Sequence, residues 1–538
     1  MNGDRSSELP PELIRLPASV PEALASRENE AANDFVVGID FRLTFGDADA
    51  SSLQVAGQLL AAGVGKGTRL GILFGNDPAW VVNWLAASRI GALTVPLSTF
   101  SPGPELARTI RHTDIAAILS APQHAGHSLV DRLEQALPGL SDSDDAIALP
   151  DAPYLRWATV DGGGPSWSRP LPPSVSPKVV AAAQEQVHPA DALVIVSTSG
   201  STSGPKSVVH THGSLVRHAA LLAGRRGLTS ADRIYSPMPF FWVGGLTMVL
   251  LAALTSGAAA LVQERFDPGE ALELAERERA TQISCWPNAA QAMKQHPTFG
   301  SRDLSSVRGG TLLEALPPAH RPPSADRAPT LLGMTETGGP HTCADDSYLP
   351  LPERLRGTFG RGLPGFEHLV ADADEPGVIG ELLVRGPLVM DAIYKAERHD
   401  TFAPDGWYAT GDTGSFDAEG YLRFNGRKTA MIKSGGSNVS PAEVESILNA
   451  IDGVRECYVF GVAAGERGED VAAVVVLRPD ADLDQDQIRA GARASLSSYK
   501  VPRHLQLVRP DELPMLPTGK VDLATLRAGF TNRGGTRR

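Results

Sequence analysis

The stretch IVSTSGSTSGPKSVVHTH, at residues 195–212, places several hydroxyl side chains and glycines ahead of a single lysine. An apolar strand that runs into a glycine-rich loop with a lysine is an arrangement that holds phosphate. Glycines let the backbone approach the ligand, hydroxyl and N–H groups donate hydrogen bonds, and Lys206 neutralises charge. The loop is not a Walker A motif, because Pro205 stands where that pattern has its second glycine. Taken alone, the stretch predicts either a phosphate-binding loop or a flexible surface loop.

Further motifs follow in order along the chain: PMPFFWVGGL at 237–246, LLGMTETGG at 331–339, GWYATGDTGSFDAEGYLRFNGR at 406–427, MIKSGGSNVSPAEVESIL at 431–448 and LPMLPTGKVDLATLR at 513–527. With TSGSTSGPKS at 198–207, they resemble the motifs of the acyl-adenylate-forming superfamily, which comprises acyl- and aryl-CoA synthetases, adenylation domains and luciferases. The resemblance extends from about Phe41 to Leu526. Six motifs in the same order make chance similarity very improbable.

The resemblance implies a reaction in two steps. A carboxylic acid attacks the α-phosphate of ATP, giving acyl-AMP and pyrophosphate, and the acyl group then passes to a thiol. Charge accumulates on the α-phosphate in the first step, so the catalysis of that step is electrostatic. The ligands that the resemblance implies are ATP or AMP, Mg²⁺, coenzyme A and a carboxylic acid.

The resemblance also implies roles for single residues. Lys520 matches the catalytic lysine that bridges the α-phosphate and the substrate carboxylate, and Thr335 would contact the α-phosphate. Glu336 would hold Mg²⁺, a hard cation that prefers carboxylate oxygen. Asp412 matches the acid that accepts hydrogen bonds from the ribose hydroxyls, and Arg427 would make a second ribose or phosphate contact.

Other positions match the thiol, acyl and nucleotide sites. Lys433 would face the active site during thioester formation, where Gly435 and Gly436 would leave room for the pantetheine arm of coenzyme A. The large ring of Trp242 would suit an apolar acyl group, with core packing as the alternative. The remaining nucleotide-binding positions are Thr198, Ser199, Gly200, Ser201, Thr202, Lys206, Gly333 and Met334, and the remaining acyl-pocket positions are Gly244, Gly309 and Gly310.

The sequence departs from the family motifs at four places. Ser203 and Ser207 replace glycines of the phosphate loop, and a Cβ at residue 203 restricts positive φ. Leu332 replaces the tyrosine that stacks on adenine, so an apolar contact stays but the ring face is lost. At the interdomain hinge, Thr429 and Ala430 stand where the motif has a charged residue. These departures affect ATP handling more than transfer to the thiol.

Two histidines, His210 and His212, raise the question of a metal site. No third ligand lies nearby in the sequence, and the resembling segment of the family is the structural start of a helix. We therefore interpret both histidines as structural.

The composition narrows the classes of function. The 538 residues carry a formal net charge of -13, which argues against binding to nucleic acid or to an anionic membrane surface. Three widely spaced cysteines argue against structural zinc and against a disulfide framework. The most apolar run, residues 246–262, is too short and interrupted to span a bilayer, and residues 1–20 lack the apolar core of a signal peptide. We expect a cytoplasmic protein with no membrane span, for which a homodimer is a possible assembly.

The elements that must position these residues follow an α/β pattern. Helical and strand patterns alternate over residues 53–98, which indicates layered α/β subdomains around a mostly parallel sheet. Residues 138–189, rich in Pro, Ser, Asp and Gly, suggest a long surface excursion. The run 246–262 predicts a buried helix followed by a buried strand. Short strands with Gly/Pro turns over residues 357–387 predict a β-rich subdomain.

The chain is predicted to divide near its hinge motif. We expect an N-terminal AMP-binding and acyl-binding domain over residues 1–427 and a small mobile α+β C-terminal domain over residues 428–538. One site cannot hold Lys520 at the α-phosphate while a pantetheine thiol enters from the same side. The small domain is therefore expected to rotate between half-reactions, with residues 428–430 absorbing the backbone change.

The leading hypothesis is an ATP-dependent acyl-CoA synthetase, an acid–thiol ligase. Two alternatives stay open: an enzyme that only forms the thioester from a preformed acyl-adenylate, and a non-catalytic relative that binds an acyl group or a nucleotide. The retained Lys520, Asp412 and Glu336 favour the full reaction. The segment after Leu526 is too short to fold as a carrier domain, so a free thiol acceptor is expected.

Overall fold

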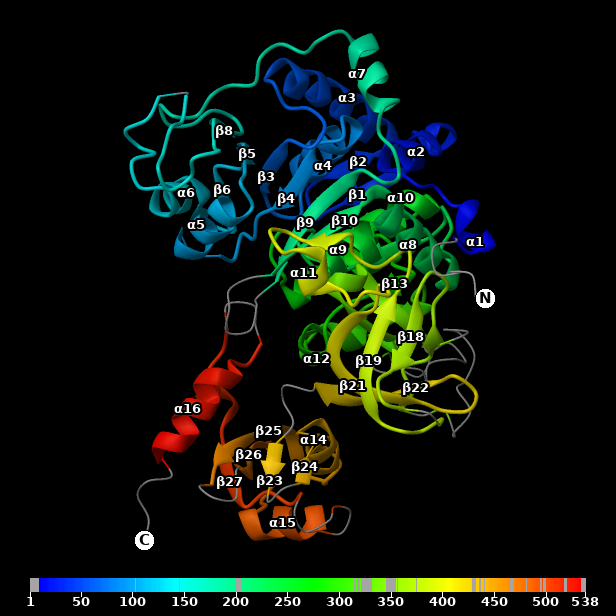
Figure 1. The fold of residues 1–538 in the computed structure, drawn as a ribbon, viewed down its shortest axis with the longest axis vertical. Helices are drawn as coiled ribbons and strands as arrows, with labels where there is room; N and C mark the ends of the chain where they lie inside the picture. The colour runs from blue at the N-terminus through cyan, green and yellow to red at the C-terminus, as the bar shows by residue number, and fades with distance from the viewer. Residues whose placement is uncertain are drawn as a thin grey trace. The chain divides into compact units, whose positions relative to one another are not determined.

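The computed structural model forms two compact units (Figure 1). The larger unit comprises Met1–Glu367 and Arg385–Trp407, and the smaller unit comprises His368–Val384 and Tyr408–Arg538. The structure describes residues 9–101, 103–144, 146–198, 206–313, 316, 320, 331–344, 355, 357–373, 375–427, 432–434, 437–439, 441–464, 469–479, 481–493, 496, 500–516 and 520–533.

A seven-stranded sheet with the order β20-β10-β9-β4-β3-β5-β8 forms one layer of the larger unit. Strands β9, β4, β3, β5 and β8 run parallel, whereas β10 is antiparallel to both of its neighbours. The bounds are β3 (Arg69–Leu73), β4 (Leu93–Pro96), β5 (Ala117–Ser120), β8 (Trp157–Val160), β9 (Ala192–Thr198), β10 (Lys206–Thr211) and β20 (Ala392–Ile393). The helices are α3 (Phe45–Ala61), α4 (Pro78–Arg89), α5 (Gly103–His112), α6 (Leu129–Ala136), α7 (Pro177–Gln184) and α8 (His212–Arg225).

A second sheet of six strands has the order β14-β13-β11-β12-β1-β2. All of its pairs are parallel except the β1–β2 pair. The bounds are β1 (Asp34–Val37), β2 (Arg42–Thr44), β11 (Arg233–Tyr235), β12 (Ala259–Leu261), β13 (Gln282–Ile283) and β14 (Gly309–Gly310), and the helices α11 (Pro268–Arg277) and α12 (Pro287–Gln295) follow β12 and β13.

Helix α4 illustrates why the sequence folds into these layers. The Asp77 side chain caps the helix by accepting a hydrogen bond from the Trp80 amide at 2.7 Å, and Pro78 occupies the first turn. Trp80 and Trp84, one helical turn apart, are fully buried, and their rings stack at 5.9 Å. The apolar face of α4 therefore lies in the core of the larger unit.

Two sequence predictions in this unit meet different outcomes. Residues 246–262 form a buried helical segment and then a strand, as predicted, although the first part, η3 (Leu246–Leu251), is a π-helix ahead of α10 (Ala252–Ser256). Residues 138–189 are not only a surface excursion, because they contribute the edge strand β8 to the main sheet. Trp157 and Val160 of β8 are buried, so local apolar residues outweigh the Pro- and Gly-rich composition around them.

The smaller unit contains a four-stranded sheet with the order β18-β19-β21-β22 and a three-stranded sheet with the order β25-β26-β27. In the first sheet, the β19–β21 and β21–β22 pairs are antiparallel. Strand β26 is buried along most of its length, since side chains of two apolar clusters cover its two faces. The bounds are β18 (Glu367–Val370), β19 (Gly380–Arg385), β21 (Tyr408–Phe416), β22 (Leu422–Arg427), β23 (Ile432–Ser434), β24 (Ser437–Val439), α14 (Pro441–Asn449), β25 (Val454–Ala463), β26 (Glu469–Leu477), α15 (Gln485–Arg493), β27 (His504–Val508) and α16 (Leu523–Arg533).

The predicted fold class is confirmed: the protein is mixed α/β, with a large N-terminal domain and a small C-terminal α+β domain. The boundary between residues 427 and 428 stays a prediction, because residues 428–431 lie outside the described part of the chain. Within the described ranges, no helix has both the length and the hydropathy that crossing a bilayer requires.

Candidate functional site

The larger unit brings together two charged residues that the sequence assigns to phosphate and Mg²⁺. Lys206 begins β10, and Glu336 lies in the 3₁₀ turn η7 (Thr335–Thr337), which follows β15 (Leu331–Met334). The Lys206 Nζ atom lies 3.8 Å from Oε1 of Glu336. Lys206 is exposed, whereas Glu336 is only 8% exposed. An exposed cation therefore faces a buried carboxylate.

The β9–β10 hairpin positions Lys206. Thr198 at the end of β9 pairs with Lys206 at the start of β10, so these two residues form the base of the predicted phosphate loop. Ser207, which replaces a glycine of the family motif, is buried, and its hydroxyl lies 3.4 Å from that of Ser197 on β9. The hairpin thus accommodates one of the four departures through a contact between two serines. Ser199, Gly200, Ser201 and Thr202, together with Ser203 and the side chain of Thr198, lie outside the described residues.

The Thr335–Pro340 segment carries the second half of this arrangement. It connects β15 to the antiparallel strand β16 (Gly339–Cys343). Nε2 of His210 lies 2.7 Å from the Thr335 carbonyl oxygen, and burial lowers the pKa of His210 to about 4. The neutral imidazole therefore donates its Nε2–H to Thr335. This contact cannot be predicted from the sequence, because its acceptor is a backbone atom.

Leu332, Gly333 and Met334 lie on β15, as consecutive residues of one strand. A Cβ at Gly333 would come within 2.6 Å of the Gly339 backbone, so only glycine fits between the two paired strands. Leu332 is half-buried, and its amide donates to the Thr342 hydroxyl at 3.3 Å. The predicted adenine contact is therefore a strand residue with part of its side chain accessible.

Trp242 lies in an aromatic cluster rather than alone in the core. Its ring makes edge contacts with Phe241 at 5.3 Å, Trp286 at 5.6 Å and Phe100 at 5.7 Å. Phe100 and Trp286 were not predicted, although each closely follows a strand, β4 and β13 respectively. The cluster offers apolar ring surface, and Phe100 is partly exposed within it.

The predicted acyl-pocket glycines lie at points of close packing. A Cβ at Gly244 would come within 3.0 Å of Sδ of Met238. Gly309 and Gly310 form the edge strand β14, and Gly310 has φ of +103°. A Cβ at Gly310 would lie 2.0 Å from the Ile283 carbonyl oxygen, so that position requires glycine.

The smaller unit carries the other predicted residues. Asp412 on β21 is 4% exposed and pairs in register with Arg427 on β22. Lys520 is exposed, and its carbonyl oxygen accepts a hydrogen bond from the Leu516 amide at 2.7 Å. Lys433 pairs with Asn438 in the β23–β24 hairpin. The side chains of Arg427 and Lys433, and all of Gly435 and Gly436, lie outside the described residues.

The chemistry of the donors fits a nucleotide-bound Mg²⁺. In the described part of the chain, no group of three or more His, Cys, Asp and Glu side chains is arranged to hold a metal ion. Mg²⁺ in nucleotide-dependent enzymes is held by one or two carboxylates together with substrate phosphates, so such a cage is not needed. The buried Glu336 carboxylate beside Lys206 would supply the protein ligand that this mode of binding uses.

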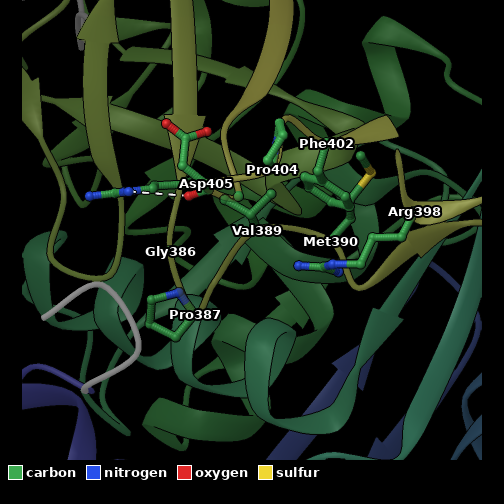
Figure 2. Close-up of a pocket in the computed structure, with 10 residues that line it drawn as sticks. Gly386, Pro387, Val389, Met390, Arg398, Phe402, Pro404 and Asp405 are labelled. Carbon is green, nitrogen blue, oxygen red and sulfur yellow. Dashed lines mark hydrogen bonds between the residues drawn. The ribbon is translucent and has the colours of Figure 1, made fainter. Parts of the chain in front are cut away.

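A cavity of about 530 Å³ lies in the segment that follows β19 (Figure 2). None of the predicted site residues that the structure describes lines it. One of its lining residues, Met390, donates its amide to the Glu336 carbonyl oxygen at 2.8 Å, so this segment supports the η7 turn. The cavity is lined by Arg385, Gly386, Pro387, Val389, Met390, Arg398, Phe402, Pro404, Asp405 and Gly406.

Comparison with known proteins identifies the family. Residues 22–394 match the AMP-binding enzyme family, and residues 443–520 match the AMP-binding enzyme C-terminal domain. The chain therefore belongs to the AMP-binding enzymes of the acyl-adenylate-forming superfamily, and it is an ATP-dependent, AMP-forming ligase. The predicted family and enzyme class are confirmed.

Curated relatives resemble the chain over nearly its whole length. It is 33% identical to a 3-[(3aS,4S,7aS)-7a-methyl-1,5-dioxo-octahydro-1H-inden-4-yl]propanoyl:CoA ligase of Mycobacterium tuberculosis, over 96% of this chain and 99% of the relative. It is 31% identical to an indoleacetate–CoA ligase of Aromatoleum aromaticum, over 89% of this chain and 93% of the relative.

Solved structures share the fold. Anthranilate CoA ligase AuaEII in complex with anthranoyl-AMP has a TM-score of 0.80 at 23% identity, over 97% of this chain and 100% of that chain. ATP-bound MatB from Rhodopseudomonas palustris has a TM-score of 0.77 at 24% identity, over 96% of this chain and 99% of that chain. These likenesses describe the fold alone.

Proposed function

We propose that this enzyme activates an apolar carboxylic acid with ATP and transfers the acyl group to coenzyme A. In the first step, a carboxylate oxygen attacks the α-phosphorus, the bond to the β-phosphate bridging oxygen breaks, and pyrophosphate leaves. In the second step, the thiol sulfur attacks the acyl carbon, its proton is released, and AMP leaves. The Lys206–Glu336 pair carries the proposal, because it sets a phosphate-binding cation at the base of the loop within 3.8 Å of a metal-binding carboxylate on the η7 turn.

The proposal gives individual roles to the charged and aromatic residues of the site. Lys206 and Lys520 neutralise phosphate charge, and Glu336 holds Mg²⁺, which would supply further electrostatic stabilisation of the phosphate oxygens. Asp412 accepts hydrogen bonds from the ribose. The rings around Trp242 provide apolar contact for the acyl group.

Two observations support the choice of substrates. The aromatic cluster at Trp242 favours an acid with an apolar or ring-containing body over a short polar one. Coenzyme A is the acceptor named for the curated relatives, which act on indoleacetate and on a bicyclic propanoate. We therefore rank arylacetic and polycyclic propanoic acids first, and fatty acids second.

The test is a panel of these acids incubated with ATP, Mg²⁺ and coenzyme A, with acyl-CoA detected by mass spectrometry. Pyrophosphate release is measured in parallel, with acid and ATP but without coenzyme A. Acid-dependent pyrophosphate together with acyl-CoA supports the full reaction. Acyl-CoA formed only from synthetic acyl-adenylate would mean that only thioester formation is retained. A panel with no product from either donor would favour a non-catalytic binding protein.

A further inference from the structure

Two buried histidines bracket the segment that carries Thr335 and Glu336. His210 lies on β10 and His218 on α8, and both side chains are fully buried. Nε2 of His210 lies 2.7 Å from the Thr335 carbonyl oxygen, and Nε2 of His218 lies 2.7 Å from the Pro340 carbonyl oxygen. A carbonyl oxygen only accepts, so each ring carries its hydrogen on Nε2.

The bracketed segment has a backbone that is costly to hold by itself. Gly338 has φ of +68° and Gly339 has φ of +139°, so the chain reverses direction through two unusual conformations. A Cβ at Gly338 would lie 2.6 Å from Cδ2 of Leu215, and a Cβ at Gly339 would lie 3.3 Å from Cε1 of His218. The turn is therefore seated directly on helix α8. Two adjacent glycines also give it many alternative conformations, which the histidine contacts restrict.

Burying these two histidines costs more fold stability than burying apolar side chains of similar size would. Nδ1 of each ring is buried and has no hydrogen-bond partner among the residues that the structure describes. Burial of an unpaired polar atom destabilises a fold, and leucine would fill a similar volume without that loss. A gain elsewhere must offset this cost, and the Nε2 contacts with the Thr335 and Pro340 carbonyl oxygens supply polar interactions that can do so.

We propose that His210 and His218 form a clamp that positions Thr335 and Glu336 for acyl-adenylate formation. The proposal rests on the proposed function. His210 holds the carbonyl group of Thr335 itself, and His218 holds the far end of the turn. The Met390 amide fixes the Glu336 carbonyl between them at 2.8 Å. With both ends and the middle of the turn held, the Glu336 carboxylate is presented to Lys206 at a fixed place. Both histidines are positioning residues and touch no reacting atom.

The experiment compares His210→Leu and His218→Leu with a variant that keeps the donor, His210→Gln. The glutamine amide reaches about as far as Nε2 of histidine, so it can still donate to Thr335. His212→Leu is the matched control: His212 is also buried and also has an unpartnered ring nitrogen, but its Nδ1 accepts from the Val20 amide at 3.3 Å. The wild-type enzyme and each variant are assayed for both half-reactions and for thermal stability.

For His210→Leu we expect kcat for acid-dependent pyrophosphate release to fall on the order of 10- to 100-fold, as a displaced catalytic group would cause. The KM for ATP should change far less, and thioester formation from synthetic acyl-AMP should keep its rate. His210→Gln should recover most of kcat, and His212→Leu should keep kcat. Calorimetry with a non-hydrolysable ATP analogue supplies a readout without turnover: the gain in affinity on adding Mg²⁺ should shrink in His210→Leu and return in His210→Gln.

The clamp would be overturned if His210→Leu kept both the wild-type kcat and the wild-type increase in affinity for the ATP analogue on adding Mg²⁺. Equal losses of kcat in His210→Leu, His210→Gln and His212→Leu would also overturn it. Should His210→Leu fail to fold by circular dichroism, His210→Asn replaces it under the same criteria, because its shorter amide does not reach Thr335. Absence of pyrophosphate release from the wild-type enzyme would refute the proposed function instead, and calorimetry would still decide whether the clamp governs Mg²⁺-dependent nucleotide binding.

Discussion

Lys520 offers a clean test of charge at the α-phosphate. Its side chain is exposed and the hydrogen bond at this residue uses its backbone carbonyl, so Lys520→Ala should leave folding intact. Loss of one preorganised charge costs about 3–4 kcal/mol of transition-state stabilisation, so acyl-AMP formation should fall by orders of magnitude. Thioester formation from supplied acyl-AMP should suffer much less. Pre-steady-state assays of the two half-reactions measure this difference.

Lys178→Ala, which removes an exposed lysine on α7, is the control for Lys520→Ala and should change neither rate. Equal losses in both half-reactions of Lys520→Ala would show that Lys520 is wrongly assigned to the adenylation step.

Leu332 governs the predicted contact with adenine. Leu332→Tyr restores a ring face at a half-buried strand position, where tyrosine is well tolerated. Stacking contributes about 1 kcal/mol, so we expect the KM for ATP to fall several-fold. Leu331→Tyr places the same ring on the opposite face of β15 and should leave the KM unchanged. Steady-state kinetics that show an unchanged or raised KM in Leu332→Tyr would mean that the adenine pocket is built differently.

Some of these residues could be found from sequence and others could not. The ordered motifs identified Lys206 and Glu336, and the structure places their charged atoms 3.8 Å apart. The role of His210 was not visible, because its partner is the Thr335 carbonyl, and backbone atoms have no sequence signature. Phe100 was missed for another reason: its contact with Trp242 depends on how two distant loops pack.

At the scale of elements, the cap of α4 predicts a pH-dependent stability. Burial raises the pKa of Asp77 from 3.8 to about 6, so the folded chain binds this proton more tightly than the unfolded chain. Asp77 therefore destabilises the fold progressively as the pH rises from 3.8 to about 6, and by a constant amount above that range. Asp77→Asn keeps a good cap without the charge and should raise the free energy of unfolding at neutral pH by at most about 3 kcal/mol.

Urea titrations of Asp77→Asn and the wild-type chain across this pH range measure the effect. The advantage of the variant should fade as the pH falls below 6, because the wild-type carboxyl is then protonated in the folded state. Asp267→Asn, at the corresponding cap of α11, controls for the amide itself. If Asp77→Asn were less stable than the wild-type chain at neutral pH, the attraction between the Asp77 charge and the amides of α4 would exceed the cost of burying that charge.

Element prediction succeeded where periodicity was strong and failed where composition misled. The patterns around β3, α4 and β4 predicted the element types correctly. The two strands are mostly apolar runs, and the helix between them has apolar residues at helical spacing. Strand β8 was missed because four residues in a Pro- and Gly-rich background give little signal, and the sheet edge supplies its pairing. The π-helix η3 was also missed, because an apolar run does not distinguish between helix types.

At the scale of the whole molecule, the proposed rotation of the small domain predicts a selective defect. We expect Thr429→Pro to fix φ near −65°, trap one arrangement, and damage one half-reaction far more than the other. Thr429→Ala keeps the backbone free and is the control. Single-turnover rates for each half-reaction provide the measurement. Full rates in both half-reactions of Thr429→Pro would place the pivot elsewhere or exclude the rotation.

Strand β20 bears on the solubility of shortened versions of this chain. Its two residues close the outer edge of β10, although they lie far along the chain, after β19. A fragment that stops before Arg385 would leave β10 as an open edge with unpaired amide and carbonyl groups, which is a template for aggregation. Strand β10, which begins with Lys206, would then be an exposed edge strand that other chains can pair with. Fragments intended for crystallisation should therefore extend past Ile393.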